Sequence, residues 1–277
     1  MDPRAAIEKP ELLPFKGRTG EKLRTAIRAL TSAEVAEAHT RAEEQLRRAE
    51  RYSAKILVHG DAEYPKHVYA SNNPEPILYV RGDPAVWASG CSVAVVGSRK
   101  TREPYSSSAR KFATTAARQG VVVISGFAMG ADSIGHSAAQ EAGGGTVCVM
   151  PCGLDKVFPP ENRSLWEGLL AYSGAVFVSQ FGFGQRASSL QLRKRNKLIV
   201  AFAQGIVVVQ SAVDGGAMNA YRFGLEQKKP VATFKADELK DTSGNAAIVK
   251  DPRTGGVAFE PTSDESEYKT WLRRLSS

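Results

Sequence analysis

Short, uniformly apolar runs divide the middle of the chain, and stretches rich in polar and small residues separate them. The runs are too apolar to have a solvated face, so each one predicts a strand that is covered on both sides. They fall at Val93–Val96, Val121–Ile124, Thr146–Met150, Ala175–Ser179, Ile206–Gln210 and Val231–Phe234. Because helical patterns lie between successive runs, we predict an α/β fold with a doubly wound, mostly parallel sheet, in which the first two strands are neighbours.

Patterns before this core predict an N-terminal helical extension and additional strands. Residues 1–20 mix proline, glycine and charge without periodicity, which indicates a loose arm. The segment Glu21–Tyr52 is rich in Ala, Leu, Glu and Arg, and Ser32 within it predicts a break with a new N-cap, so we expect two helices. Two short strands, Lys55–Val58 and Ile77–Val80, should lead into the main sheet and add an edge strand to it.

The chain therefore divides into an N-terminal arm with helices, the α/β domain and a C-terminal tail, over residues 1–54, 55–250 and 251–277. The tail predicts irregular structure, room for one short strand and a final helix over Ser266–Leu275. Within the domain, Asn162 is the predicted N-cap of a helix that runs from Arg163 to Tyr172.

The composition of the 277-residue chain is typical of a globular protein, with 42% hydrophobic and 24% charged residues. The excess of 37 Lys and Arg over 29 Asp and Glu gives a net charge of +8, which favours nucleic acid or another polyanion as a partner. Three cysteines are too few for a disulfide framework and lack the partners of a zinc site, which fits the reducing cytoplasm. The N-terminus lacks the apolar region of a signal peptide, and no apolar run approaches the ~20 residues of a membrane span, so neither export nor membrane insertion is expected.

The turns that follow the central strands are rich in glycine and small polar residues. Because the carboxyl ends of parallel strands share one edge of a sheet, these turns should line a single crevice, where helix N-termini favour an anion. Arg99 and Lys100 follow the first turn, Gly97-Ser98, so we expect a phosphate between a guanidinium and the amides of the next helix. A surface arginine without a ligand is the alternative. The turn matches neither GxGxxG nor GxxxxGK(S/T), which argues against a dinucleotide site and a P-loop.

The densest basic run of the chain follows the fourth strand, and it comprises Arg186, Arg193, Lys194, Arg195 and Lys197. Phe181 and Phe183 precede it in a glycine-rich loop that we expect to be flexible. Cations beside aromatic rings are typical of proteins that bind single-stranded nucleic acid, because the cations meet the backbone and the bases stack on the rings. A solvated helix face is the alternative interpretation.

The helix after the second strand carries a pair of titratable residues, Asp132 and His136. Their spacing of four places them on one helix face, so a hydrogen bond between carboxylate and imidazole is expected. No activated nucleophile accompanies them, and a structural clamp is therefore favoured over a catalytic dyad.

Four ordered motifs lie between about Lys55 and Val249, and they read Val96-Gly97-Ser98-Arg99, Ser125-Gly126-Phe127-Ala128-x-Gly130-x-Asp132-x-x-Gly135-His136, Gly153-Leu154-Asp155-x-x-Phe158-Pro159-x-x-Asn162 and Arg195-Asn196-Lys197-x-Ile199. This set closely resembles the DprA/Smf DNA-processing family of the LOG/SLOG superfamily. The resemblance implies a Rossmann-like domain that has no catalytic activity and binds single-stranded DNA in a basic pocket. It also implies a homodimer that hands the strand to a recombinase during transformation.

The patterns and the resemblance together select the candidate DNA-binding residues, which are Gly97, Ser98, Arg99, Lys100, Ser125, Gly126, Lys156, Phe158, Arg186, Arg193, Lys194, Arg195, Asn196, Lys197, Gly215 and Gly216. Single-stranded DNA is the expected partner, in DNA uptake, recombination or defence against foreign DNA. We expect no catalytic residue, no metal ion and no cofactor.

Several positions depart from the pattern of the family. Gln180 and Gln210 stand where the family carries glutamates after its fourth and fifth strands, which makes the pocket less acidic. The related LOG-like nucleotide hydrolases carry a Pro-Gly-Gly-x-Gly-Thr-x-x-Glu motif, and its Gly, Thr and Glu align here with Met218, Asn219 and Arg222. The missing acid argues against cleavage. A nucleotide-sensing or nucleotide-cleaving module of this kind is the alternative to a protein that binds single-stranded DNA.

Overall fold

The structure is a computed structural model that describes residues 11, 17–71, 74–88, 90–261 and 264–275. The chain divides into two compact units, with the boundary after Arg48. The loose arm predicted for residues 1–20 lies for the most part outside the described residues.

Two helices lie in the N-terminal region, α2 (Gly17–Arg28) and α3 (Ser32–Arg51), so the predicted break between two helices is confirmed. The predicted N-cap, Ser32, was wrong by one residue. Thr31 Oγ1 accepts a hydrogen bond from the Glu34 amide at 3.2 Å, and the Glu34 carboxylate accepts one from the Thr31 amide at 2.7 Å. This reciprocal pair is a capping box, and it satisfies two amides that the first turn of α3 leaves unpaired.

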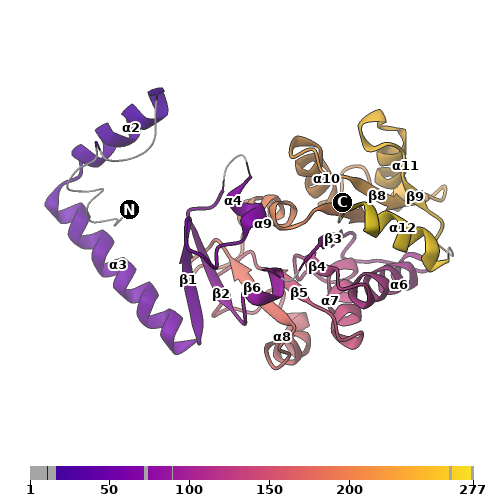
Figure 1. Ribbon diagram of the computed structural model, residues 1–277, viewed down its shortest axis with the longest axis horizontal. Helices are drawn as coiled ribbons and strands as arrows, with labels where there is room; N and C mark the ends of the chain where they lie inside the picture. The colour runs from indigo at the N-terminus through magenta and orange to yellow at the C-terminus, as the bar shows by residue number, and fades with distance from the viewer. Residues whose placement is uncertain (1–10, 12–16, 72–73, 89, 262–263, 276–277) are drawn as a thin grey trace. The chain divides into compact units, whose positions relative to one another are not determined.

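A nine-stranded sheet forms the centre of the second unit, in the order β1-β2-β6-β5-β4-β3-β7-β8-β9 (Figure 1). The strands are β1 (Ala54–Val58), β2 (Ile77–Arg81), β3 (Ser92–Val96), β4 (Val122–Ser125), β5 (Thr146–Val149), β6 (Ala175–Ser179), β7 (Gly205–Val208), β8 (Val231–Phe234) and β9 (Ala258–Phe259). All pairs from β6 to β9 are parallel, whereas β1 and β2 extend the sheet beyond β6 as an antiparallel edge. The predicted α/β fold, the parallel pairing of β3 with β4 and the added edge are confirmed.

Helices cover both faces of this sheet. They are α4 (Lys66–Tyr69), α5 (Ala85–Ala88), α6 (Tyr105–Arg118), α7 (Ala131–Glu141), α8 (Arg163–Leu170), α9 (Ser189–Phe202), α10 (Ala217–Glu226), α11 (Ser243–Lys250) and α12 (Glu265–Leu275), with short 3-10 turns at η2 (Pro160–Asn162), η3 (Lys240–Thr242) and η4 (Pro252–Thr254). Alternate residues of β3 point to opposite faces. Val93 and Val95 pack with Phe112 of α6, whereas Ala94 and Val96 pack in the cluster that contains Leu198 of α9.

The C-terminal segment packs on the same sheet. β9 pairs with β8, and α12 buries Tyr268, Trp271 and Leu272 in the cluster that contains Phe112 of α6. Within the described parts of the chain, every helix is too short or too polar to cross a lipid bilayer.

Helix α8 begins at Arg163, as predicted, but Asn162 does not cap it. The Asn162 side chain is buried and donates from Nδ2 to the carbonyl oxygen of Phe127 at 2.9 Å. Phe127 has a φ of 62°, which is unusual for a residue with a large side chain. Asn162 therefore holds the turn after β4 in place, and its prediction as a helix cap was wrong.

Candidate functional site

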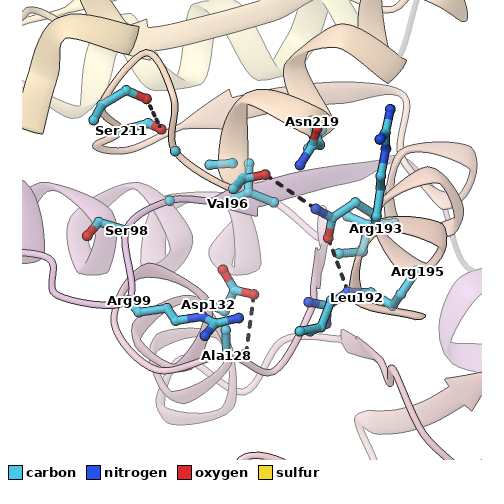
Figure 2. A pocket seen from close by; sticks show the side chains of 18 of the residues that line it. Val96, Ser98, Arg99, Ala128, Asp132, Leu192, Arg193, Arg195, Ser211 and Asn219 are labelled. Atoms are coloured by element: carbon cyan, nitrogen blue, oxygen red, sulfur yellow. Dashed lines mark hydrogen bonds between the residues drawn. The ribbon is translucent and has the colours of Figure 1, made fainter. Parts of the chain in front are cut away.

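The order of the strands reverses at β3, because the chain proceeds to β4, β5 and β6 on one side and returns to β7 and β8 on the other. At such a switch point the loops after two adjacent strands separate and leave a crevice at the carboxyl edge of the sheet. A pocket of about 540 Å³ lies there, between the loops after β3 and β7 and the helices α9 and α10 (Figure 2). This volume is suited to a ligand the size of a nucleotide.

The loop after β3 brings Gly97, Ser98 and Arg99 to the pocket. A Cβ on Gly97 would lie 2.7 Å from the Ala131 Cβ, so only glycine fits between the strand end and α7. Ser98 donates its amide to the Gln210 carbonyl at 2.7 Å, and its own carbonyl accepts the Ala131 amide at 3.1 Å. The loop is thereby attached to the end of β7 and to the start of α7.

Arg99 and Lys100 are exposed in this loop and do not begin a helix. Helix α6 starts only at Tyr105, after Pro104, which lacks an amide hydrogen and fits best just before or within a first helical turn. The predicted helix start directly after the glycine turn was therefore wrong. Arg99 is presented by a loop, without a helix N-terminus of its own.

The floor of the pocket contains a buried arginine and a buried aspartate, Arg195 and Asp132. Arg195 donates from Nη1 to the carbonyl oxygens of Gly126 and Val149, the second at 2.9 Å. Asp132 accepts the amides of Gly126 at 3.1 Å and Ala128 at 3.3 Å. Burial raises the pKa of Asp132 and lowers that of Arg195 to about 10, while the attraction between the two charges opposes both shifts. The pair fixes the turn after β4 from two sides.

Helix α9 forms one wall. Its N-cap, Ser188, accepts the Gln191 amide at 3.3 Å, and Arg193 and Asn196 of the next turn line the pocket. Asn196 donates from Nδ2 to the Gly216 carbonyl at 3.4 Å, across the pocket. The position of Asn196 therefore links α9 to the start of α10.

The opposite wall comes from the loop after β7 and from α10, through Ser211, Gly215, Gly216 and Asn219. A Cβ on Gly215 would lie 2.5 Å from the Ser211 Oγ, so the tight loop needs glycine there. The loop leads directly into α10, whose N-terminus opens onto the pocket and favours an anion.

Asp241 of η3 also lines the pocket, and no sequence motif indicated it. Arg102 donates to both of its carboxylate oxygens, from Nε at 2.9 Å and from Nη2 at 3.0 Å. Arg102 also pairs with Asp237. These hydrogen bonds lower the pKa of Asp241, so the carboxylate stays ionised and is balanced by Arg102.

The remaining charges of the pocket are positive. Among the described residues, neither Arg99 nor Arg193 forms an ion pair, while Asp132 and Asp241 each face an arginine of their own. Figure 2 shows Arg99 and Arg193 at different sides of the pocket. Two uncompensated guanidinium groups at one pocket favour an anionic ligand.

A second pocket of about 250 Å³ adjoins the first and shares Arg99, Ala128, Leu192 and Arg195 with it. Its other walls include the charged side chains of Lys100 and Glu161 and the apolar side chains of Met129, Phe158 and Pro159. A pocket with an apolar wall beside a cationic one suits a ligand that has a flat base next to a phosphate.

The structure brings most of the predicted DNA-binding residues to these two pockets, namely Gly97, Ser98, Arg99, Lys100, Gly126, Phe158, Arg193, Arg195, Asn196, Gly215 and Gly216. It places the others outside both linings, namely Ser125, Lys156, Arg186, Lys194 and Lys197. Ser125 is buried and donates to the Val95 carbonyl at 2.6 Å, so it belongs to the sheet. Lys156 lies 3.4 Å from the Asp155 carboxylate.

The aromatic residues before the basic run are buried, contrary to the prediction of a flexible loop that offers them to bases. Phe181 and Phe183 are 8% and 4% exposed. Phe183 stacks on Tyr52 at a centroid distance of 5.7 Å and packs edge-on against Tyr79 at 5.4 Å. Packing against Tyr79 of β2 and Tyr52 before β1 removes the Phe183 ring from solvent, and Phe181 is buried as well.

The predicted hydrogen bond between Asp132 and His136 was also wrong. His136 Nδ1 lies 2.7 Å from the Thr146 Oγ1, and this hydroxyl donates to the Val123 carbonyl at 2.9 Å, so Nδ1 carries the proton. Both predicted clamp residues are buried, but they bind different partners.

The model of the DNA recombination-mediator protein A family matches residues 55–254 of the chain. Protein Smf of Borreliella burgdorferi is 29% identical over 195 residues, which are 69% of this chain and 60% of that protein. Protein Smf of Escherichia coli is 32% identical over 176 residues, which are 63% of this chain and 46% of that protein. The chain thus spans about half the length of these relatives.

Two solved structures share the fold. DNA processing protein A of Helicobacter pylori, for which a single-stranded DNA binding mode is described, superposes with a TM-score of 0.71 at 21% identity, over 80% of this chain and 97% of that one. DNA processing protein A of Streptococcus pneumoniae gives a TM-score of 0.70 at 21% identity, over 92% of this chain and 82% of that one.

Proposed function

The chain belongs to the DNA recombination-mediator protein A family, the DprA/Smf DNA-processing proteins, and we propose on this basis that it binds single-stranded DNA in the pocket at the switch point of its sheet. The observation that carries the proposal is the pair of uncompensated arginines, Arg99 and Arg193, at a pocket of nucleotide size. The binding of single-stranded DNA by the Helicobacter pylori relative supports it.

In this proposal the DNA backbone occupies the larger pocket. Phosphates of the strand meet the Arg99 and Arg193 guanidinium groups at the two sides of the pocket and the N-terminus of α10 at Gly216. An adjacent base enters the smaller pocket and packs on Phe158 and Met129. Arg195 does not contact the strand in this arrangement, because its guanidinium is engaged with backbone carbonyls of the floor.

We propose that the protein binds DNA without cleaving it. Asn219 and Arg222 stand at the positions where the LOG-like hydrolase motif requires Thr and Glu, and neither side chain is an acid that could assist hydrolysis. Membership of the family further supports a homodimer that works in the cytoplasm and delivers the strand to a recombinase.

Fluorescence anisotropy with a labelled oligothymidylate tests this function. Arg99→Ala should weaken binding about tenfold or more, because a charge-assisted contact is lost, whereas Arg186→Ala, which removes an exposed arginine outside both pockets, should bind like the parent. A mononucleotide that competes as well as the oligonucleotide would instead support the nucleotide-sensing alternative.

A further inference from the structure

An exposed pair of aromatic rings lies on the edge of the domain formed by β1, β2 and α4. His59 follows β1, Tyr69 ends α4, and their rings stack with centroids 4.3 Å apart and an interplanar angle of 11°. Tyr69 is 53% exposed, and His59 is exposed as well. The buried Tyr64 supports the pair from below, since its ring meets His59 edge-on at 5.5 Å. The stack is therefore held in place while part of it faces solvent.

Two lysines outside the lining of the DNA pocket lie on α9, the helix that forms one wall of that pocket. Lys194 and Lys197 belong to α9, whose pocket-facing residues include Arg193 and Asn196. Burial raises the pKa of the Glu75 carboxyl, and the charges of Lys197 and Lys194 oppose that rise. α4 packs against α9, as Figure 1 shows.

Glu75 also contacts Tyr64, the residue that supports the aromatic pair. Its carbonyl accepts the Tyr64 hydroxyl at 2.6 Å, and Tyr64 is the ring beneath His59. The helix that lines the pocket, α9, is also the neighbour of α4, which carries Tyr69 of the stacked pair.

We infer that the His59–Tyr69 stack, together with Lys194 and Lys197, is a second contact surface for the single-stranded DNA that leaves the pocket. This inference rests on the proposed function. Cationic groups that follow the backbone and exposed rings that take bases are the two features by which proteins hold single strands without reading their sequence. Phe181 and Phe183 cannot supply the rings, because both are buried.

The carboxylates near the stack affect how strongly this second surface should bind a DNA strand. Asp61 accepts the Val58 amide at 2.7 Å, and Glu63 pairs with Lys55 at 2.7 Å, so both are partly compensated. Glu75 interacts electrostatically with Lys194 and Lys197, and its carboxylate would repel a phosphate that these lysines attract. Glu75→Gln should therefore strengthen the binding of a long strand.

The experiment compares oligothymidylates of about four and about twenty nucleotides, the first long enough for the pocket alone and the second long enough to reach the stack. Tyr69→Ala in the full chain should weaken binding of the long strand about fivefold or more and leave the short strand unaffected. Tyr69→Phe keeps the ring and should bind both like the parent. Lys194→Ala should follow Tyr69→Ala, while Lys250→Ala, at an exposed lysine of α11, is the matched control.

The outcomes separate this inference from the proposed function. If Tyr69→Ala and Lys194→Ala bind the long strand like the parent, while Arg99→Ala loses both strands, the second surface is refuted and the pocket stands. If Arg99→Ala binds the short strand like the parent, the pocket itself is refuted. Circular dichroism of each variant shows whether the fold is kept, and Glu75→Gln tests the second surface through a side chain outside the stack.

Discussion

The side chain of Gln210 donates from Nε2 to the Oδ2 of Asp241 at 2.7 Å, at the edge of the larger pocket. Its Oε1 accepts the amide of Arg102 at 3.0 Å, so this buried group acts as donor and acceptor at once. It joins the end of β7, the loop after β3 and the turn after β8. A glutamate, which the pattern of the family predicts at this position, would offer only acceptors when ionised.

Gln210→Glu should therefore lower the free energy of unfolding at neutral pH by about 1–3 kcal/mol, because it replaces a hydrogen bond with two facing carboxylates. Asp241→Asn in the same chain should restore only part of the loss, because its amide can donate to the new carboxylate but no longer accepts from Nε of Arg102 at that position. Urea denaturation of the four members of this double-mutant cycle measures the coupling. If Gln210→Glu is as stable as the parent, the new carboxylate does not lie close to the Asp241 carboxylate.

The buried pair in the floor predicts a separate effect on stability. Asp132→Ala leaves Arg195 without its countercharge and the amides of Gly126 and Ala128 without their acceptor. We expect a loss of about 3–5 kcal/mol in unfolding free energy, with a smaller effect on the DNA affinity of the folded fraction. Asp214→Ala, at an exposed carboxylate, is the control. DNA binding that vanishes at an unchanged melting temperature would contradict the structural role.

The burial of His136 predicts that the folded protein loses stability at acidic pH. Its Nε2 is buried without a hydrogen-bond partner in the described structure, and burial, followed by the charge of Arg195, lowers the pKa of His136 to about 3. An unfolded histidine has a pKa near 6.5, so between about pH 6.5 and pH 3 the unfolded state binds more protons. Stability is therefore lost as the pH falls through this window, by up to about 1.4 kcal/mol per pH unit from this residue.

His136→Asn removes this titration and keeps a donor toward Thr146. The variant should be less stable at pH 7, because the core loses ring volume, yet its stability should depend less on pH. Urea denaturation at several pH values from about 4.5 to 7 measures both slopes. Parallel slopes would mean that another group controls acid unfolding.

The sheet and the place of its crevice were predictable because the evidence for them is local. Continuous apolar runs such as Val93–Val96 and Val121–Ile124 define buried parallel strands, and the carboxyl ends of such strands share one edge. The glycine turns at Gly97 and Gly215 therefore indicated the edge of the sheet at which the pocket lies. The antiparallel β1 and β2 were visible as short apolar segments flanked by proline and glycine turns.

The orientation of individual side chains was not predictable, because it depends on contacts between distant segments. Phe183 is buried by Tyr52 and Tyr79, which lie more than a hundred residues earlier in the chain. The rotation of α9 by about 100° per residue brings Arg193 to the pocket and leaves Lys194 outside its lining, although the two are adjacent in a basic run. The sequence of a basic run does not show which of its lysines and arginines face a pocket.

Arg99 predicts how binding depends on salt. Each phosphate contact to a single strand contributes about 0.7 to the slope of log affinity against log salt concentration, because counterions are released. Arg99→Ala should reduce the magnitude of this slope by about 0.7, and Arg193→Ala should do the same if both arginines meet a phosphate. Arg99→Lys should keep the slope, because the charge remains, but should recover only part of the affinity, because an ammonium group lacks the fork that grips two phosphate oxygens. Titrations with one oligothymidylate at salt concentrations from about 50 to about 200 mM measure both the affinity at each salt concentration and the slope of log affinity against log salt concentration. If Arg99→Ala loses affinity but keeps the full slope, Arg99 acts by shaping the loop after β3 and does not contact the backbone.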